Sequence, residues 1–450
     1  MNNKERILHI GLDAHDSPIG GCTTHFSYLL TRKLLSRNNV EFIDYPNLIR
    51  LNPVIPWRTR GNGAVVIRIK FTGDLDDLID EIKSMSMEYV SEVSKEVKGK
   101  KPGIVLYTGI VNDLLRWIYR RALTDVVDLD VALRICEKVK AKIIGGVSQG
   151  VIGALAAIGG LGPGEDYTFE LIAYRSPEYW GLRDRLVDYE SVEVMDKNTK
   201  PYTFNNIDYE VGKVLITPRG PDPVLFGIRG EDPRILVNAL NYVKVHEPIS
   251  GWMIFRTNQG TDAHIVHRFI GLLRPYQTGR IHGIISSKPK SIRGGHVEFT
   301  IRDSTGKVKA YVYEPTGKFR DIALKLIEGD EVILYGVTRP GLTPGTLTFS
   351  VEKIEVIKLS PLIIIKNPKC PKCGKTMKSM GKDKGFKCPK CKFKDPNAKK
   401  VKIIAKRNDI KPGLYVVPPR AMRHLTKPLC RYGMEKKAFH GILKNTPWIN

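Results

Sequence analysis

The chain has 450 residues, which is too long for one ordinary hydrophobic core and predicts about three or four domains. This length also excludes a peptide hormone or a small disulfide scaffold. The 42% hydrophobic and 26% charged residues are typical of a folded protein and exclude a disordered or collagenous chain. The 72 Lys and Arg exceed the 47 Asp and Glu by 25, which favours a polyanion as the partner.

The basic residues are concentrated in the C-terminal part of the chain. Residues 361–450 contain 24 Lys and Arg against four Asp and Glu. We therefore expect this part to contact nucleic acid, although a solvated lysine-rich face would have the same composition. The seven cysteines, an odd number, indicate a reducing compartment rather than a disulfide framework.

Neither a membrane span nor a signal peptide is expected. The longest apolar stretch, at 151–161, is far shorter than the roughly 20 residues that a membrane-spanning helix needs. Asp13 and Asp16 interrupt the apolar run near the N-terminus, so the length and cleavage site of a signal peptide are missing. We expect a cytoplasmic protein, and the sequence carries no indication of its oligomeric state.

Strand and helix patterns alternate over residues 1–140, which predicts an α/β domain. Strands are expected at 6–12, 63–71 and 104–107, and helices at 23–36, 75–97 and 112–121.

A second domain is expected over residues 141–275, with the β-α-β-β-α-β order of a ferredoxin-like unit. Its predicted elements are a leading strand at 141–145, helices at 150–158 and 233–243, and further strands at 168–174, 213–216, 224–228 and 252–256.

Short strands over residues 276–360 predict an OB-fold, a barrel that commonly binds oligonucleotides. An unrelated small β-barrel is the alternative. The predicted order is three strands at 280–286, 296–302 and 308–313, a helix at 319–327, and two strands at 331–337 and 346–357.

Two CxxC pairs lie in the last part of the chain, residues 361–450. Cys370, Cys373, Cys388 and Cys391 have the spacing at which two tight turns present four thiolates to Zn²⁺. Because cysteines fill all four positions, no place remains for a catalytic water, and the zinc would be structural. A redox dithiol pair or core cysteines are the alternatives. We expect a zinc ribbon with a basic C-terminal tail.

The loop at 11–24, GLDAHDSPIGGCTT, combines acidic residues with the start of a helix. The carboxylates of Asp13 and Asp16 suit Mg²⁺, and they follow a strand at the end where α/β sheets bind ligands. The backbone N–H groups at a helix N-terminus suit phosphate. The loop therefore indicates a nucleoside triphosphate site, although an ordinary helix cap beside a solvated turn would have the same residues. The phosphate-binding candidates in it are Ser17, Gly20, Gly21 and Thr24.

Two further loops carry polar residues. In RLNPVIPWRTRGNG at 50–63, Arg58 and Arg60 could hold phosphates and Trp57 could stack on a base, or the segment could be a basic surface loop. The segment TNQGTDAH at 257–264 contains Asp262 and His264, and alone it is a weak signal.

Together these segments resemble the archaeal tRNA-Ile 2-agmatinylcytidine synthetase family. The resemblance covers essentially the whole chain. Its remaining segments are GVIGALAAIG at 150–159, TFELIAYR at 168–175, VLFGIRG at 224–230 and PPRAMRHLTKPL at 418–429.

The resemblance implies a kinase-like domain, a ferredoxin-like domain, an OB-fold and a zinc ribbon. It also implies an enzyme that uses ATP to phosphorylate the C2 carbonyl oxygen of the wobble cytidine in a CAU-anticodon isoleucine tRNA. Agmatine then displaces the phosphate to give agmatidine, which reads AUA. The runner-up hypothesis is a non-enzymatic RNA- or single-stranded-DNA-binding protein. The acidic loop speaks against it, because carboxylates repel a polyanion unless a cation intervenes. An ATP-dependent tRNA enzyme that uses another amine is a third hypothesis.

The resemblance also assigns roles in the acidic loop. Thr23 matches the family's phosphorylated threonine, and Asp13 and Asp16 match its metal-binding aspartates. The family's usual loop reads Asp-Asp-Thr-Asp-Ser, whereas Ala14 and His15 stand here at its second and third positions. One carboxylate is thereby lost, which bears on how many Mg²⁺ ions are held, and His15 is a poor Mg²⁺ ligand.

Agmatine requires a carboxylate, because its guanidinium stays protonated and prefers a planar acceptor. Asp262 is the first candidate for this role and Glu170 the second.

Overall fold

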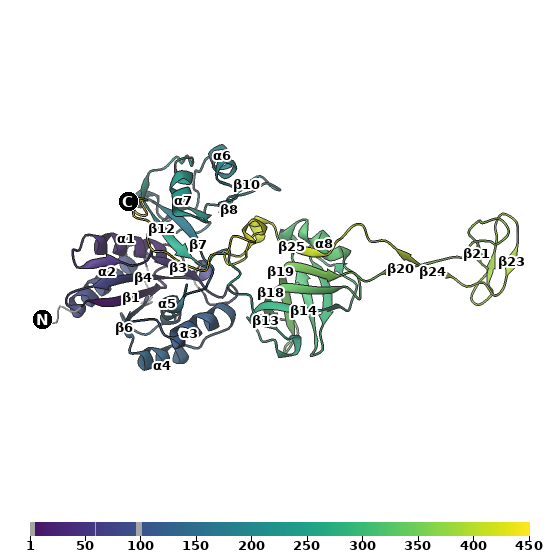
Figure 1. Ribbon diagram of the computed structural model, residues 1–450, viewed down its shortest axis with the longest axis horizontal. Helices are drawn as coiled ribbons and strands as arrows, with labels where there is room; N and C mark the ends of the chain where they lie inside the picture. The colour runs from purple at the N-terminus through teal and green to yellow at the C-terminus, as the bar shows by residue number, and fades with distance from the viewer. Residues whose placement is uncertain (1–4, 59, 96–100) are drawn as a thin grey trace.

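The computed structural model describes residues 5–58, 60–95 and 101–450. Figure 1 shows a large α/β part at one end of the molecule, a β-barrel in the middle and a small ribbon at the far end of an extended arm. The sequence predicted mixed α/β domains, an OB-fold and a zinc ribbon, and this architecture is confirmed.

The α/β part is built on one ten-stranded sheet that runs through both of its halves. The first half has the strand order β6-β5-β1-β4-β3, and all its neighbouring strands are antiparallel. A parallel pairing of β3 with β12 joins it to the second half, in the order β12-β7-β11-β8. The strands of the first half are β1 (Arg6–Asp13), β2 (Val40–Phe42), β3 (Asn47–Arg50), β4 (Gly63–Phe71), β5 (Gly103–Thr108) and β6 (Lys142–Ile144).

The second half has the ferredoxin-like order, although it starts later in the chain than predicted. The elements are β7 (Thr168–Arg175), α6 (Tyr189–Thr199), β8 (Thr203–Phe204), β11 (Val224–Gly230), α7 (Pro233–Leu240) and β12 (Ile249–Thr257). The strand expected at 141–145 to lead this unit is instead β6, which pairs with β5 at the edge of the first half. The short strands β9 (Ile207–Asp208) and β10 (Lys213–Val214) form a separate hairpin.

Helices cover both faces of the sheet, and each face has its own apolar core. On one face lie α1 (Thr23–Leu35) and α2 (Leu75–Glu92). On the other lie α3 (Asp113–Thr124), α4 (Leu129–Val139), α5 (Gly150–Gly159), α6 and α7. The predicted helix at 75–97 ends at Glu92, and its residues 96 and 97 lie outside the described residues.

Helix α5 packs tightly across β1. A Cβ atom added at Gly11 of β1 would lie 2.2 Å from the Ala154 carbonyl oxygen, so the close approach requires glycine. The helix was predicted as part of the second domain, and it packs on the first half of the sheet.

The barrel is the predicted OB-fold. It contains β14 (Thr278–Ile285), β16 (Val297–Arg302), β17 (Lys307–Val312), α8 (Phe319–Lys325), β18 (Glu331–Pro340) and β19 (Leu347–Lys358). The barrel closes because β17 pairs with β19 in parallel and β14 pairs with both β16 and β18. The short strands β13 (His267–Arg268) and β15 (Lys290–Ser291) extend this sheet.

A two-stranded arm, β20 (Leu362–Lys366) and β24 (Val401–Ala405), carries the ribbon strands β21 (Lys378–Ser379), β22 (Phe386–Lys387) and β23 (Lys394–Asp395). After the arm, β25 (Gly413–Val416) pairs with β19 of the barrel.

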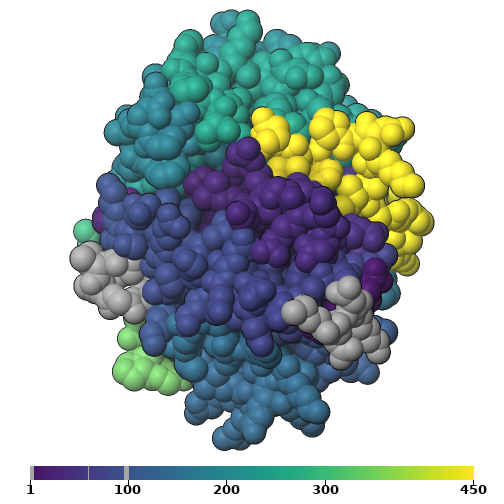
Figure 2. Space-filling view, turned by 90° about the vertical axis from the view of Figure 1, so that its left-hand side faces the viewer, coloured from purple at the N-terminus to yellow at the C-terminus, as the bar shows by residue number. Residues whose placement is uncertain are grey.

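Residues 418–450, which we call the tail, return from the barrel to the α/β part. Figure 2 shows the C-terminal residues in yellow between the purple N-terminal residues and the teal second half. The buried Arg431 pairs with Glu231 and Asp166, and Ile449 forms a β-bridge with Met253 of β12. The tail therefore packs on the α/β part, and part of its charge is neutralised there.

Candidate active site

The acidic loop connects β1 to α1 and is held in a fixed conformation. Asp13 is the last residue of β1, and Ala14 adopts a left-handed backbone conformation with φ of 60°. Asp16 forms a β-bridge with Gly21, and the Ser17 amide donates to the Gly20 carbonyl oxygen at 2.8 Å. Because the neighbours of β1 are antiparallel, the loop does not lie at the carboxyl edge of a parallel sheet as the sequence had suggested.

Three predicted phosphate-binding residues of this loop form its internal contacts. The Ser17 hydroxyl donates to the Ser94 carbonyl oxygen and accepts from the Gly20 amide at 3.2 Å. A Cβ atom at Gly20 would lie 2.7 Å from the Val93 carbonyl oxygen. At Gly21, where φ is 69°, it would lie 2.0 Å from the Ser94 hydroxyl. Ser17 and the two glycines thus fit the loop against the end of α2.

Two cavities open on the two sides of the loop. The first, of about 410 Å³, lies between the halves of the sheet and is lined by Asp16, Thr23 and Thr24. The second, of about 310 Å³, is lined by Asp13, Ala14 and the start of α5. The sequence predicted Asp13 and Asp16 beside one nucleotide, but in the structure they face different cavities.

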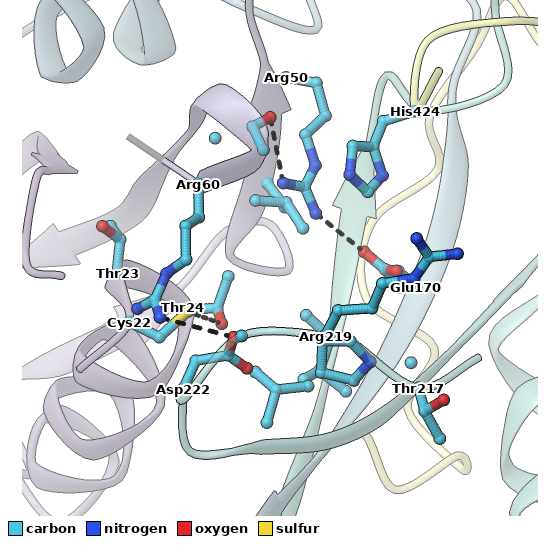
Figure 3. A pocket seen from close by; sticks show the side chains of 18 of the residues that line it. Cys22, Thr23, Thr24, Arg50, Arg60, Glu170, Thr217, Arg219, Asp222 and His424 are labelled. Atoms are coloured by element: carbon cyan, nitrogen blue, oxygen red, sulfur yellow. Dashed lines mark hydrogen bonds and ion pairs between the residues drawn. The ribbon is translucent and has the colours of Figure 1, made fainter. Parts of the chain in front are cut away.

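The first cavity contains alternating acidic and basic side chains (Figure 3). Glu170 of β7 is only 3% exposed, and its Oε1 accepts from Arg229 Nε at 3.1 Å. Its Oε2 accepts from Gln259 Nε2 at 2.5 Å and lies 3.8 Å from Arg50 Nη2. Burial lowers the pKa of Arg50 from its usual value, and the Glu170 carboxylate opposes that shift. Glu170 is therefore held firmly, by groups from three segments of the chain.

Arg60 lies between two other carboxylates of the first cavity. Its guanidinium is 3.6 Å from Asp16 Oδ2 and 3.8 Å from Asp222 Oδ2. It also donates to the Gly21 carbonyl oxygen at 2.6 Å. Arg60, which the sequence predicted as a phosphate ligand, thus ties the acidic loop to the segment before β11.

The N-terminus of α1 opens into the first cavity. Cys22 precedes the helix without a side-chain cap, and Thr23 and Thr24 form its first turn. The Thr23 hydroxyl accepts from the His15 amide at 3.3 Å. Burial raises the pKa of the Cys22 thiol, so the thiol is protonated and the helix N-terminus keeps its partial positive charge.

The second cavity is lined by the N-terminus of α5, Arg58 and Lys101, together with Asp13 and Asp125. Apolar side chains line the rest, among them Leu51, Ile55 and Ile152. Trp57, which is 59% exposed, lies at this cavity with its ring edge-on to Tyr276. The predicted loop at 50–63 therefore contributes to both cavities, with Arg60 in the first and Arg58 in the second.

The two residues that depart from the family's loop have different surroundings. Ala14 lines the second cavity. His15 is fully buried, stacks on Phe26 at 4.2 Å and lies 2.9 Å through Nε2 from the Ser86 hydroxyl of α2. The His15 side chain therefore holds the loop to the helices, and it lines neither cavity.

The structure does not bring Asp262 to either cavity. Its carboxylate accepts from Lys353 Nζ of the barrel at 2.5 Å and from the Lys427 amide at 2.7 Å. Asp262 therefore joins the α/β part to the barrel and the tail, whereas Glu170 lies in the first cavity. Sequence reasoning missed several side chains of that cavity, among them Arg50, Asp222, Arg229 and His424. Arg50 lies in the basic loop, and Arg229 and His424 lie in segments that carry the family resemblance. Membership of these segments was the signal by which the three could have been found.

Comparison with known proteins matches nearly the whole chain to one family. Models described as the TiaS TCKD domain, the TiaS FLD domain and the TiaS C-terminal zinc ribbon domain match residues 9–145, 148–264 and 367–408. A model described as an OB-fold nucleic acid binding domain matches residues 280–357. A protein of Staphylothermus marinus named as the tRNA-Ile 2-agmatinylcytidine synthetase TiaS is 45% identical over 99% of both chains. The chain belongs to the tRNA-Ile 2-agmatinylcytidine synthetase family.

Other members of the synthetase family are similar in sequence and in structure. A relative from Ignisphaera aggregans is 43% identical over 96% of this chain and 94% of its own. A solved structure described as apo TiaS is 37% identical, covers 94% of this chain and 97% of its own, and has a TM-score of 0.80. A complex of TiaS with its isoleucine tRNA and ATP, 37% identical over 95% of this chain and 97% of its own, has a TM-score of 0.83. A complex of TiaS with the same tRNA, AMPCPP and agmatine, 35% identical with the same coverage, has a TM-score of 0.80.

The zinc ribbon of this synthetase has a complete ligand set. The Sγ atoms of Cys370, Cys373, Cys388 and Cys391 all lie within 4.8 Å of one another. Four thiolates about 2.3 Å from one ion at tetrahedral positions would have this spacing, so the residues fit structural Zn²⁺. None of the helices in the described parts of the chain is long and apolar enough to cross a bilayer.

Proposed function

We propose that the protein uses ATP to join agmatine to C2 of the wobble cytidine of the CAU-anticodon isoleucine tRNA, giving agmatidine. The observation that carries this proposal is the similarity to a curated synthetase over 99% of both chains, with the acidic loop lying between two cavities. Relatives with 35–37% identity have been crystallised with the isoleucine tRNA and ATP, or with that tRNA, AMPCPP and agmatine.

The chemistry needs two substrates to meet at the cytidine. The C2 carbonyl oxygen is a poor leaving group until a phosphoryl group is attached to it. Once it is phosphorylated, the amine of agmatine attacks C2, the C2–O bond breaks and phosphate leaves with the electron pair. A site for this sequence must bind a triphosphate and an amine on either side of one base, and two cavities flanking one loop suit that requirement.

The second cavity is our proposed site for ATP. The N-terminus of α5, Arg58 and Lys101 would bind phosphates, and the apolar side chains with Trp57 would contact the adenine. The close approach of α5 to Asp13 supports the assignment of this cavity to ATP, since a Cβ atom at Gly153 would lie 1.9 Å from Asp13 Oδ2. The Asp13 and Asp16 carboxylates are hard oxygen ligands of the kind Mg²⁺ prefers, and Asp13 is the one of the two that lines this cavity. When bound, Mg²⁺ would neutralise charge on the triphosphate.

The first cavity is our proposed site for the cytidine and agmatine. Thr23, the predicted phosphate acceptor, lines it together with Thr24 at the start of α1. Glu170 and Asp222 are the two carboxylates on its far side, and we assign the agmatine guanidinium to them in place of Asp262. Asp222 has weaker contacts than Glu170, with Arg185 at 3.4 Å and Arg60 at 3.8 Å, so it is the more accessible acceptor.

Product analysis tests the proposed function directly. The purified protein is incubated with a transcript of the CAU-anticodon isoleucine tRNA, ATP and agmatine, and the nucleosides are analysed by mass spectrometry. We expect an agmatine adduct on the wobble cytidine that requires both ATP and agmatine. A transcript with uridine at the wobble position is the matched control, and putrescine in place of agmatine tests the hypothesis of another amine. Tight tRNA binding without any adduct would favour the non-enzymatic alternative.

Transfer RNA binding and cellular location are also proposed. The lysine-rich ribbon and the OB-fold are the surfaces expected to contact the tRNA, as the charge distribution predicts. The cytoplasmic location expected from the sequence stays a prediction.

A further inference from the structure

The first cavity is completed by His424, a residue of the tail that follows the barrel and the zinc ribbon in the chain. The His424 carbonyl oxygen accepts from the Gly260 amide at 2.8 Å, and the Leu425 carbonyl oxygen accepts from the Asp262 amide at 2.8 Å. The tail is therefore fastened to the segment at 257–264, and it presents the imidazole to the cavity next to Arg50 (Figure 3).

His424 belongs to a closed ring of polar contacts around Glu170. Its Nδ1 lies 3.0 Å from Gln259 Oε1 and 3.1 Å from Arg229 Nη2. Gln259 and Arg229 are the two groups that donate to the Glu170 carboxylate, one to each oxygen. The ring leaves little room, because a Cβ atom at Gly227 would lie 3.0 Å from Glu170 Oε1.

The charges around the imidazole favour its neutral form. Burial lowers the pKa of His424 well below its usual value, and the positive charges of Arg50 and Arg229 lower it further. The Glu170 carboxylate is the acidic group of the ring, and it is neutralised by the same arginines. Near neutral pH the ring therefore contains an uncharged imidazole, whose Nδ1 either donates to Gln259 Oε1 or accepts from Arg229 Nη2.

We propose that His424 is a positioning residue for the agmatine step, and that it acts through Gln259 and Arg229 to fix the orientation of Glu170. This inference rests on the proposed function, because it takes Glu170 as part of the agmatine site. With His424 removed, the group that is bonded to Nδ1, either Gln259 or Arg229, loses its partner and the carboxylate loses its fixed direction. The residues that line the ATP cavity, on the other side of the acidic loop, include no member of this ring, so ATP chemistry should not change.

Two substitutions separate positioning from proton transfer. In His424→Asn the amide lies near the place of Nδ1, whereas in His424→Gln it lies near the place of Nε2. We expect His424→Ala and His424→Gln to raise the agmatine KM about tenfold, the usual cost of a lost buried hydrogen bond that orients a ligand group. We expect His424→Asn to stay within about threefold of wild type. ATP consumption without agmatine should be the same in all variants, and His267→Ala, at an exposed histidine of β13, is the matched control.

The outcomes distinguish this inference from the proposed function. No agmatine adduct with the wild-type protein would overturn both. Normal wild-type ligation with an unchanged agmatine KM in His424→Ala would overturn the positioning role alone. If His424→Asn lost kcat as fully as His424→Ala at saturating agmatine, the imidazole would be a proton acceptor and the positioning role would be wrong. If ATP consumption fell in parallel with ligation, the residue would have a general structural role instead.

Discussion

Replacing Gly153 of α5 with alanine should disable the ATP site without unfolding the protein. The added Cβ atom would lie 1.9 Å from Asp13 Oδ2, whereas ordinary contacts begin near 3.4 Å, so the carboxylate has to move by roughly 1.5 Å. A displacement of about 1 Å can cost a reaction about 100-fold in rate. We therefore expect ATP consumption by Gly153→Ala to fall at least 100-fold.

The same substitution should have a small effect on stability. Alanine is favoured over glycine within a helix by about 0.5–1 kcal/mol, which offsets part of the steric strain of about 1–3 kcal/mol. Asp13 can also turn into the second cavity, which it lines. We expect the free energy of unfolding to change by less than about 2 kcal/mol, measured by urea denaturation.

Gly306 provides the matched control, because a Cβ atom there would make only ordinary contacts of 3.4 Å and more. Gly306→Ala should keep both ATP consumption and stability. Full ATP consumption by Gly153→Ala would refute the assignment of Asp13 to the nucleotide. Global unfolding of Gly153→Ala would refute the expectation that movement of the Asp13 carboxylate relieves the steric clash while the protein stays folded.

Three further predictions concern other parts of the molecule. Cys388→Ser should lose the single zinc ion, measured by metal analysis. Its ribbon should unfold while the α/β part keeps its thermal transition. Zinc retained at one ion per chain would contradict the ligand set. Excising 362–405 should weaken tRNA binding and flatten its salt dependence, because this segment contains 14 Lys against two Asp; an unchanged slope would make it a solvated face. Burial and the charge of Arg68 lower the pKa of His9 to about 4. The free energy of unfolding should therefore fall as the pH drops from about 6.5 towards 4, and His9 contributes at most about 1.4 kcal/mol per pH unit to this fall. His9 takes up its proton in the unfolded chain first, so His9→Gln should reduce this pH dependence in urea titrations, and an identical dependence would contradict the assignment.

Excising the segment tests the ribbon better than cutting the chain before it. A chain cut after Leu359 would lose Arg431 and His424 together with the ribbon, and the loss of tRNA binding could not be separated from damage to the α/β part. The strands β20 and β24 pair from Leu362 with Ala405, so the two ends of the excised segment already lie side by side.

The parts of the structure that could be predicted from the sequence are those whose patterns lie within a short stretch of the chain. The OB-fold follows from alternating short strands, and the zinc site follows from the spacing of four cysteines, since each pair forms one turn. Helix α6 was missed because, in YESVEVMDKNT, Val192 and Met195 are the only fully buried apolar residues. The strand at 142–144 was given to the wrong half of the sheet, because a run of three residues carries no information about its partner.

The candidate site was only half visible in the sequence. The acidic loop could be found because its residues are neighbours in the chain. The opposite wall of the first cavity could not, because Glu170, Asp222 and His424 come from β7, the segment before β11 and the tail. They meet through the parallel pairing of β3 with β12 and the return of the tail, and neither contact has a periodic signature.

The return of the tail also has a consequence for biosynthesis. In the chain, the barrel and the ribbon form a long insertion between the strands of the α/β sheet and the tail that packs on that sheet. During synthesis on the ribosome, the α/β part lacks the imidazole of His424, and it also lacks the guanidinium of Arg431 between Glu231 and Asp166 until codon 431 has been translated. By then the barrel strands from β14 to β19 have already left the exit tunnel. An unfinished polypeptide therefore has these barrel strands before its first cavity is complete, and a premature stop codon after the ribbon would release a protein without His424 and Arg431.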